Sequence, residues 1–144
     1  MIGAKNKVEG ENNKLEGEKN IVKGVDNTIN GGSNAVLGQR INIEGNGNKA
    51  AGSDHFITGD QNKVGGEGNI IGGNTNTLIG KNNIAEGKEN TALGNLNEIE
   101  GNGNAIVGEK NRIQNGDNNI LQGLNNNVSG SQNYIEGNAN TVKE

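Results

Sequence analysis

Aliphatic residues recur every seven positions along this chain, each with Asn two residues before it and Gly two residues after it. Cutting after each such Gly divides residues 4–144 into twenty units, and the fifth position of every unit is Val, Ile, Leu or Ala. Eighteen units carry Asn at the third position, while Ile41 and His55 replace it in the other two. One unit, 109–116, contains an additional Asn before its Gly. A period this regular predicts a repeat architecture.

The seven-residue unit predicts a short β-strand followed by a turn. In an extended chain, Asn and the aliphatic residue point to one side and the two residues flanking the aliphatic point to the other. Gly then supplies the turn because it adopts positive φ without penalty. A coiled coil also has a seven-residue period, but it needs two apolar positions per heptad and tolerates little Gly. The sequence therefore predicts an all-β parallel solenoid, a single repeat domain over 1–144 with no helix.

The residue before each Gly indicates how many strands close one coil. In one set of alternate units this residue is apolar or small: Leu37, Ala51, Gly65, Ile79, Leu93 and Val107. In the other set it is mostly acidic or polar: Glu44, Thr58, Gly72, Glu86, Glu100 and Gln114. Taking every third unit would mix the two sets. Coils of two units, 14 residues long, are therefore predicted, giving a flattened roll of about ten coils.

Such a roll has two unlike outer faces. We call face one the outward residues of the alternate units that include Leu37 and Ile79, and face two those of the units that include Glu44 and Glu86. Face one is a flat, rather apolar stripe, and such stripes usually contact a partner. Face two is expected to be a solvated surface. The predicted binding residues are those of face one: Ala35, Leu37, Ala51, Thr77, Ile79, Thr91, Leu93, Ala105 and Val107.

The recurring Asn has a structural role in this arrangement. An inward amide carries both donors and acceptors, so it can bond the turn backbone and the Asn one coil away. Ile41 and His55 are expected to occupy the same rows as substitutes. The central part of this predicted ladder comprises Asn62, Asn69, Asn76, Asn83, Asn90, Asn97, Asn104 and Asn111.

Composition supports a repeat fold and excludes several functions. The chain has 144 residues, 31 of them Asn and 26 Gly, and its only aromatic residues are Phe56 and Tyr134. A core of large side chains is out of reach, but stacked repeats can bury small aliphatics. A net charge of −4 argues against nucleic-acid binding. There is no apolar run long enough to span a membrane, and the N-terminal stretch does not resemble a signal peptide.

The sequence offers no catalytic or metal-binding constellation. The single His, His55, has no Cys as a partner, and the carboxylates lie on a regular outer face instead of in a cleft. Calcium-binding β-rolls have nine-residue repeats with a fixed Asp, whereas this chain has a period of seven and four Asp in total. We therefore expect a protein that is not an enzyme and that uses no metal or cofactor.

The units NKVEG, NTING, NAVLG, NTLIG, NNVSG and the longer NRIQNG resemble the repeat of the ryegrass-type ice-binding proteins, which inhibit ice recrystallisation. The resemblance covers all twenty units. It implies a left-handed parallel β-roll that holds ice on one flat face, and an extracellular location. On that pattern the ice-facing residues flank the aliphatic position, and only face one offers a match. Lys49 and Lys63 interrupt this face, which departs from the pattern.

Two functions from different classes remain open. In the first, face one binds ice. In the second, the chain is a structural or adhesive solenoid whose face one docks onto itself or onto another protein, and a weaker resemblance to the heads of bacterial trimeric adhesins is in keeping with it. Measured ice activity would separate the two.

Overall fold

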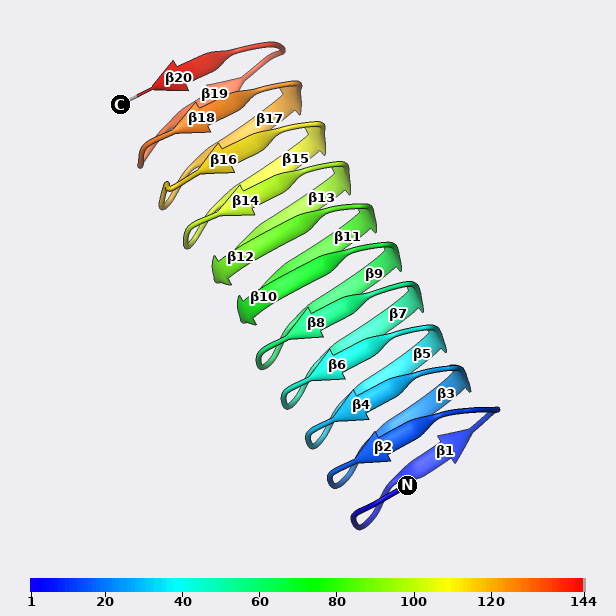
Figure 1. Cartoon of the computed structure of the whole chain (residues 1–144). Helices are drawn as coiled ribbons and strands as arrows, with labels where there is room; N and C mark the ends of the chain where they lie inside the picture. Colours follow the sequence, from blue (N-terminus) through cyan, green and yellow to red (C-terminus); the bar gives the residue numbers. More distant parts are fainter. Residues whose placement is uncertain (144) are drawn as a thin grey trace.

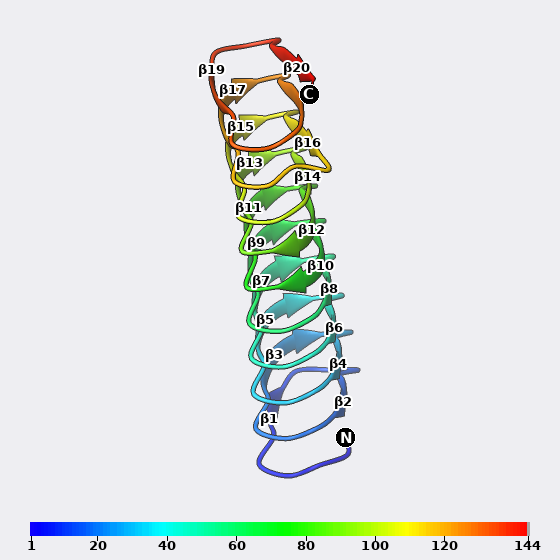
Figure 2. The same ribbon diagram turned by 90° about the vertical axis from the view of Figure 1, so that its left-hand side faces the viewer.

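The computed structural model describes residues 1–143, and every regular element in that range is a β-strand. Twenty strands form two parallel sheets of ten, and the chain alternates between the sheets from one strand to the next. Figure 1 shows the resulting slender stack, with the two ends of the chain at opposite ends of the roll. In Figure 2 the two sheets are seen as separate layers joined by turns. The predicted parallel solenoid of 14-residue, two-strand coils is confirmed.

The first sheet, called sheet one, contains the odd-numbered strands and carries face one. Its strands are β1 (Lys7–Glu9), β3 (Ile21–Val25), β5 (Ala35–Gln39), β7 (Lys49–Ser53), β9 (Lys63–Glu67), β11 (Thr77–Lys81), β13 (Thr91–Asn95), β15 (Ala105–Glu109), β17 (Ile120–Leu124) and β19 (Tyr134–Glu136).

The second sheet, called sheet two, contains the even-numbered strands and carries face two. Its strands are β2 (Lys14–Glu16), β4 (Thr28–Asn30), β6 (Asn42–Glu44), β8 (Phe56–Thr58), β10 (Ile70–Asn74), β12 (Ile84–Lys88), β14 (Glu98–Glu100), β16 (Arg112–Gln114), β18 (Asn127–Ser129) and β20 (Thr141–Lys143).

Strands within a sheet pair with the equivalent residues one coil away. Leu78, for example, pairs with Val64 on one side and with Ala92 on the other. The inward aliphatics of the two sheets meet in the middle of the roll and form one continuous core. No helix in the described range is long and apolar enough to cross a membrane. The core is therefore built by repetition of small aliphatic contacts, as expected for a chain almost without aromatic residues.

The turns explain why Gly closes each unit. Gly80 has φ +131°, and a Cβ at this position would collide with the backbone carbonyl of Gly94 in the next coil. The residue before the inward Asn takes the left-handed conformation even when it is not Gly, as at Asp26 (φ 58°) and Leu96 (φ 56°). Each corner therefore combines one obligatory Gly with one position that tolerates several residue types at a modest conformational cost.

The additional residue in 109–116 is absorbed at a corner. Gly116 still occupies the Gly row, since its amide donates to the carbonyl of Glu100 over 3.2 Å. Asn115 takes the left-handed conformation (φ 49°) between Gln114 and Gly116. Strand pairing continues in register beyond it, because Ala105 pairs with Ile120 and Arg112 with Asn127. One coil of 15 residues is thus inserted without a break in either sheet.

Candidate functional site

Face one consists of two outward columns of side chains on sheet one. The first column lies before the buried aliphatic of each strand and the second lies after it. From β11 to β17 the first column reads Thr77, Thr91, Ala105 and Ile120, and the second reads Ile79, Leu93, Val107 and Gln122. These eight outward side chains are uncharged. They form a continuous stretch between Lys63 on β9 and Glu136 on β19.

The strand register holds these side chains at equal intervals. Thr77 pairs with Thr91, and Ile79 pairs with Leu93. Neighbouring strands in a sheet are about 4.8 Å apart, so each column repeats at about that spacing. The first-column Thr77 and Thr91 are half-buried beside the larger second-column side chains, of which Ile79 remains 44% exposed. The stretch is therefore a regular surface of methyl and hydroxyl groups.

A hydrogen-bonded Asn ladder supports sheet one from behind. In the central coils, Nδ2 of Asn76 donates to Oδ1 of Asn62 over 3.2 Å and to the carbonyl of Gly87 over 2.9 Å. The backbone amide of Asn90 in turn donates to Oδ1 of Asn76 over 2.9 Å. Within residues 1–143 no buried side-chain nitrogen or oxygen lacks a partner. The predicted ladder is thus confirmed, and it links each coil to its neighbours on both sides.

The irregularities of the repeat lie on the side of sheet two. Ile41 and His55 stand in the ladder of sheet two, as predicted, and both are buried. The amide of Ile41 donates to Oδ1 of Asn27 over 3.0 Å, but Ile41 has no side-chain oxygen to offer the next coil. His55 restores an acceptor, because its Nδ1 lies 3.3 Å from the amide nitrogen of Asn69. Burial lowers the pKa of the His55 imidazole below its ordinary value.

Sheet one has the more regular scaffold of the two. Its ladder runs through ten Asn residues without substitution. Its strands from β3 to β17 are five residues long, whereas in sheet two only β10 and β12 reach that length. Asn115 also lies on the side of sheet two, directly after β16. Face one is therefore presented on a more uniform backbone than face two.

A second, outer ladder runs along the corner that leads from sheet two into sheet one. Oδ1 of Asp60 accepts from the amide of Asn46 over 2.7 Å, and the amide of Asp60 donates to Oδ1 of Asn74 over 2.8 Å. In an equivalent bond, the backbone amide of Lys88 donates to Oδ1 of Asn102 over 3.0 Å. In this outer ladder each backbone N–H donates to a side-chain oxygen of the following coil. In the inner ladder each backbone N–H donates to a side-chain oxygen of the preceding coil. Sequence reasoning missed this ladder, although its short polar residues directly after Gly were a visible signal.

Ion pairs between neighbouring coils neutralise several cations on the surface. Four such pairs lie within residues 1–143: Lys23–Glu9 at 3.1 Å, Arg40–Asp54 at 2.6 Å, Lys81–Glu67 at 3.0 Å and Arg112–Glu98 at 3.2 Å. The Arg40 guanidinium holds the pKa of the Asp54 carboxyl below its ordinary value through their hydrogen bond. All eight side chains are well exposed, so each pair contributes little to stability.

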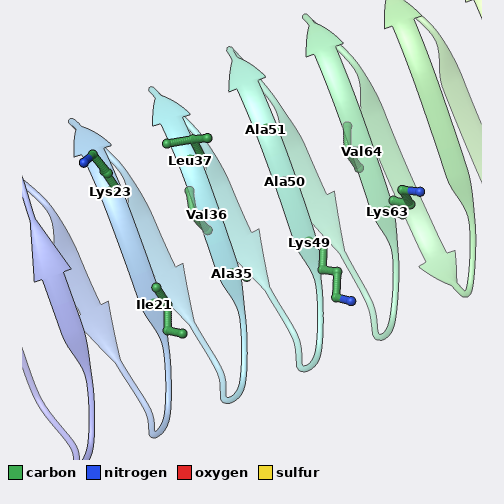
Figure 3. Close-up of a pocket in the computed structure, with 10 residues that line it drawn as sticks. All are labelled: Ile21, Lys23, Ala35, Val36, Leu37, Lys49, Ala50, Ala51, Lys63 and Val64. Carbon is green, nitrogen blue, oxygen red and sulfur yellow. The ribbon is translucent and has the colours of Figure 1, made fainter.

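Lys49 and Lys63 differ from these cations. They occupy the first column of face one on adjacent strands and lie directly opposite each other. None of the ion pairs found in residues 1–143 includes either of them. Like charges in this position are destabilising. Beside them is a shallow apolar hollow of about 400 Å³, whose rim includes Ile21, Leu37 and the two lysines. Figure 3 shows these side chains around the small residues Ala35 and Ala51.

Face two carries a short apolar column in its middle, where a solvated surface was expected. Phe56, Ile70 and Ile84 stack in register and are each 42–48% exposed. The neighbouring column contains Glu86 and Glu100, which also lie opposite each other. The apolar stretch of face two is therefore only three residues long and has carboxylates beside it, unlike the uncharged stretch of face one.

The family comparison agrees with this geometry. A family model described as "Grass antifreeze beta roll" matches residues 1–97, which is more than half of the chain. The chain belongs to this family. A search of curated proteins found no match to this chain. Membership of the grass antifreeze β-roll family confirms the resemblance to the ryegrass-type repeat. Together with the solenoid fold, it points to a protein that is not an enzyme.

The structure extends face one beyond the residues predicted from the sequence. Ile120 follows Ala105 in the first column and is 49% exposed. The residues predicted from the sequence end at Val107, and the additional Asn115 shifts the numbering of every later unit by one. Compensating for that shift would have placed Ile120 and Gln122 on face one. Of the nine predicted residues, Thr77, Ile79, Thr91, Leu93, Ala105 and Val107 lie in the uncharged stretch, while Ala35, Leu37 and Ala51 lie at the hollow.

Proposed function

We propose that this protein binds ice through face one, and that the uncharged stretch from β11 to β17 is the binding surface. One observation carries the proposal. Eight uncharged outward residues repeat in register on the sheet whose Asn ladder has no substitution. Family membership supports ice as the partner, since the model that matches residues 1–97 describes antifreeze β-rolls.

The physical argument begins with the nature of the ice surface. Ice presents fixed, regularly spaced water molecules, so a complementary protein surface must be equally regular and must not lose much conformational freedom on contact. Strand pairing and the Asn ladder fix the backbone in advance, which removes much of the entropic cost of binding. The short side chains of Thr77, Thr91 and Ala105 have few rotamers to lose. Face one can therefore order adjacent water without first ordering itself.

Charged side chains act against this role. A Lys is mobile and keeps its own hydration shell, so it disturbs a water layer that must match a lattice. The two columns from β11 to β17 contain no charged residue, and charges such as Lys81 and Glu109 stand only at strand ends, whereas the columns of face two have Glu86, Glu98, Glu100 and Arg112 in the corresponding region. This difference favours face one over face two as the ice-binding side.

The test compares two substitutions of Thr by Lys on opposite faces. Thr91→Lys places a charge in the middle of the proposed surface, and Thr58→Lys places the same charge at an exposed position on β8 of face two. We expect the wild type and Thr58→Lys to inhibit ice recrystallisation and to produce thermal hysteresis at micromolar concentration. Thr91→Lys should lose most of both effects while its circular dichroism spectrum is unchanged. Absence of any effect of the wild type on ice growth would refute the proposal, as would equal activity of the two variants.

A further inference from the structure

Side-chain sizes on face one alternate between its two columns on β5, β7 and β9. On β5 the small Ala35 is followed by the large Leu37, while on β7 the large Lys49 is followed by the small Ala51. On β9, Lys63 is followed by Gly65, where an added Cβ would have no atom within 4 Å. Each of these coils therefore presents one protruding side chain and one vacant space beside it.

This pattern is self-complementary under one symmetry operation. A two-fold axis parallel to the roll, lying over the middle of face one, brings each coil opposite the same coil of a second copy and exchanges the two columns. Lys63 then faces the second copy's Gly65, Lys49 faces the second copy's Ala51, and Leu37 faces the second copy's Ala35. Such an interface is isologous, so every favourable contact occurs twice. The hollow shown in Figure 3 becomes the space that receives the long side chains of the second copy.

The charges on β1 are complementary under the same operation, whereas Lys23 on β3 faces Ile21 and Glu136 on β19 faces Tyr134. Lys7 and Glu9 occupy the two columns of β1, so each faces its opposite charge in the second copy. The aliphatic part of Lys63 lies over the second copy's Gly65 and directs its ammonium towards the corner beyond, where Glu67 ends β9. Lys49 is directed in the same way towards Asp54, which follows β7. The two lysines that have no ion pair within one copy of residues 1–143 thus reach carboxylates of the second copy, each of which also pairs with a cation of its own copy.

We propose that face one also pairs with face one of a second copy, in a parallel two-fold dimer that covers the ice-binding stretch. The statement about ice rests on the function proposed above, whereas the dimer itself does not. Ten coils at about 4.8 Å, each contributing the three-residue segment from the first column to the second, about 10 Å long, give a footprint of roughly 480 Å² per copy. Stable interfaces bury about 800 Å² per partner. The dimer is therefore weak and forms reversibly as the concentration rises, so that dilution frees face one.

The experiment uses sedimentation equilibrium of the wild type from micromolar to millimolar concentration, with two matched variants. Gly65→Lys places a second lysine opposite Lys63 of the other copy. Gly72→Lys places the same residue at the equivalent open position of face two, where an added Cβ would be 3.9 Å from Cγ of Glu86. We expect a monomer–dimer equilibrium for the wild type and for Gly72→Lys. For Gly65→Lys the dimer dissociation constant should rise at least tenfold.

A charge exchange tests the orientation of the two copies. In the double variant Lys63→Glu/Gly65→Lys, each new Glu faces a new Lys across the two-fold axis, so dimerisation should return. If the rolls were antiparallel with the uncharged stretches centred on each other, β9 would lie opposite β19, and this exchange would restore nothing. A wild type that stays monomeric at millimolar concentration overturns the proposal. Equal weakening by Gly65→Lys and Gly72→Lys does so too.

The outcome is separable from that of the ice proposal. A strictly monomeric protein that is active on ice refutes the dimer and leaves ice binding intact. A dimer that forms as described, from a monomer with no effect on ice, supports the dimer and refutes ice binding. If both proposals hold, ice activity per molecule should fall as the dimer accumulates, and it should fall less for Gly65→Lys.

Discussion

Asn76 donates a hydrogen bond from Nδ2 to Oδ1 of Asn62, one coil away, over 3.2 Å. The same amide group satisfies the carbonyl of Gly87 and the backbone amide of Asn90. One buried side chain therefore connects three coils. The Asn repeated every seven residues in the sequence is explained by this connection, because no other short side chain offers two donors together with an acceptor.

The first prediction concerns this ladder. Asn76→Ala would leave the Gly87 carbonyl and the Asn90 amide without these side-chain partners inside the roll. A buried unsatisfied group costs about 1–3 kcal/mol, so for these two groups we expect a loss of about 2–6 kcal/mol in the free energy of unfolding, measured by urea denaturation. Asn42→Ala is the control, since Asn42 points outward from β6 and its loss should change stability by less than about 0.5 kcal/mol. Similar values for the two variants would contradict a stabilising ladder.

The second prediction contrasts two glycines of adjacent coils. Gly80 has φ +131° and faces the backbone of Gly94, so Gly80→Ala should destabilise the roll by about 4 kcal/mol or prevent folding. Gly65 lies within β9 with open space around it. Gly65→Ala should therefore be neutral, or stabilise by up to about 1 kcal/mol through reduced freedom of the unfolded chain.

Thermal unfolding followed by circular dichroism distinguishes the two glycine variants. A melting temperature that falls as far for Gly65→Ala as for Gly80→Ala would show that the backbone conformation at the turn is not what requires Gly.

The third prediction concerns pH and His55. Burial lowers the pKa of His55 in the folded state below about 6.5, its value in an unfolded chain. Protonation therefore favours unfolding. Above about pH 6.5 the group has no effect, and between about 6.5 and the folded pKa stability is lost as the pH falls, by up to about 1.4 kcal/mol per pH unit. His55→Asn removes this loss and places an amide oxygen opposite the backbone of Asn69.

Urea denaturation at pH 7.5 and pH 5 tests the His55 prediction. The carboxylates are common to both proteins, so the difference between the wild type and His55→Asn reports the histidine together with its charge interaction with the adjacent Asp54. We expect His55→Asn to be the more stable protein at pH 5, with a smaller advantage at pH 7.5. A stability difference that does not change with pH would contradict a buried neutral imidazole.

The parts of the structure that could be predicted from sequence are those that repetition specifies. Asn and aliphatic residues at fixed spacing determine the inward side of every strand. The contrast between the two sets of alternate units, to which Ile79 and Glu86 belong, predicted that two strands close a coil. These features depend on the residue type at one position, repeated many times, and so a single sequence reveals them.

The features that sequence reasoning missed depend on geometry between coils. The outer ladder through Asn46, Asp60 and Asn74 left a signal in the short polar residues directly after Gly, but those residues vary, and assigning the bond requires knowing which coil each backbone amide faces. The placement of Ile120 depended on whether Asn115 would shift the strands or be absorbed at a corner.

The last prediction is a gain of activity from removing charge. Lys49 and Lys63 end the uncharged stretch of face one at β11, although Ala35, Leu37, Ala51 and Gly65 on β5 to β9 are small or apolar. Lys49→Thr/Lys63→Thr would extend the uncharged surface from four strands to seven. At concentrations below dimer formation, thermal hysteresis should rise roughly twofold, in proportion to the added contact area. Lys14→Thr on β2 of face two is the control and should leave hysteresis unchanged. The prediction fails if the double variant is no more active than the wild type while Thr91→Lys still abolishes activity. That result would show that the N-terminal half of face one does not reach the ice even when its charges are removed.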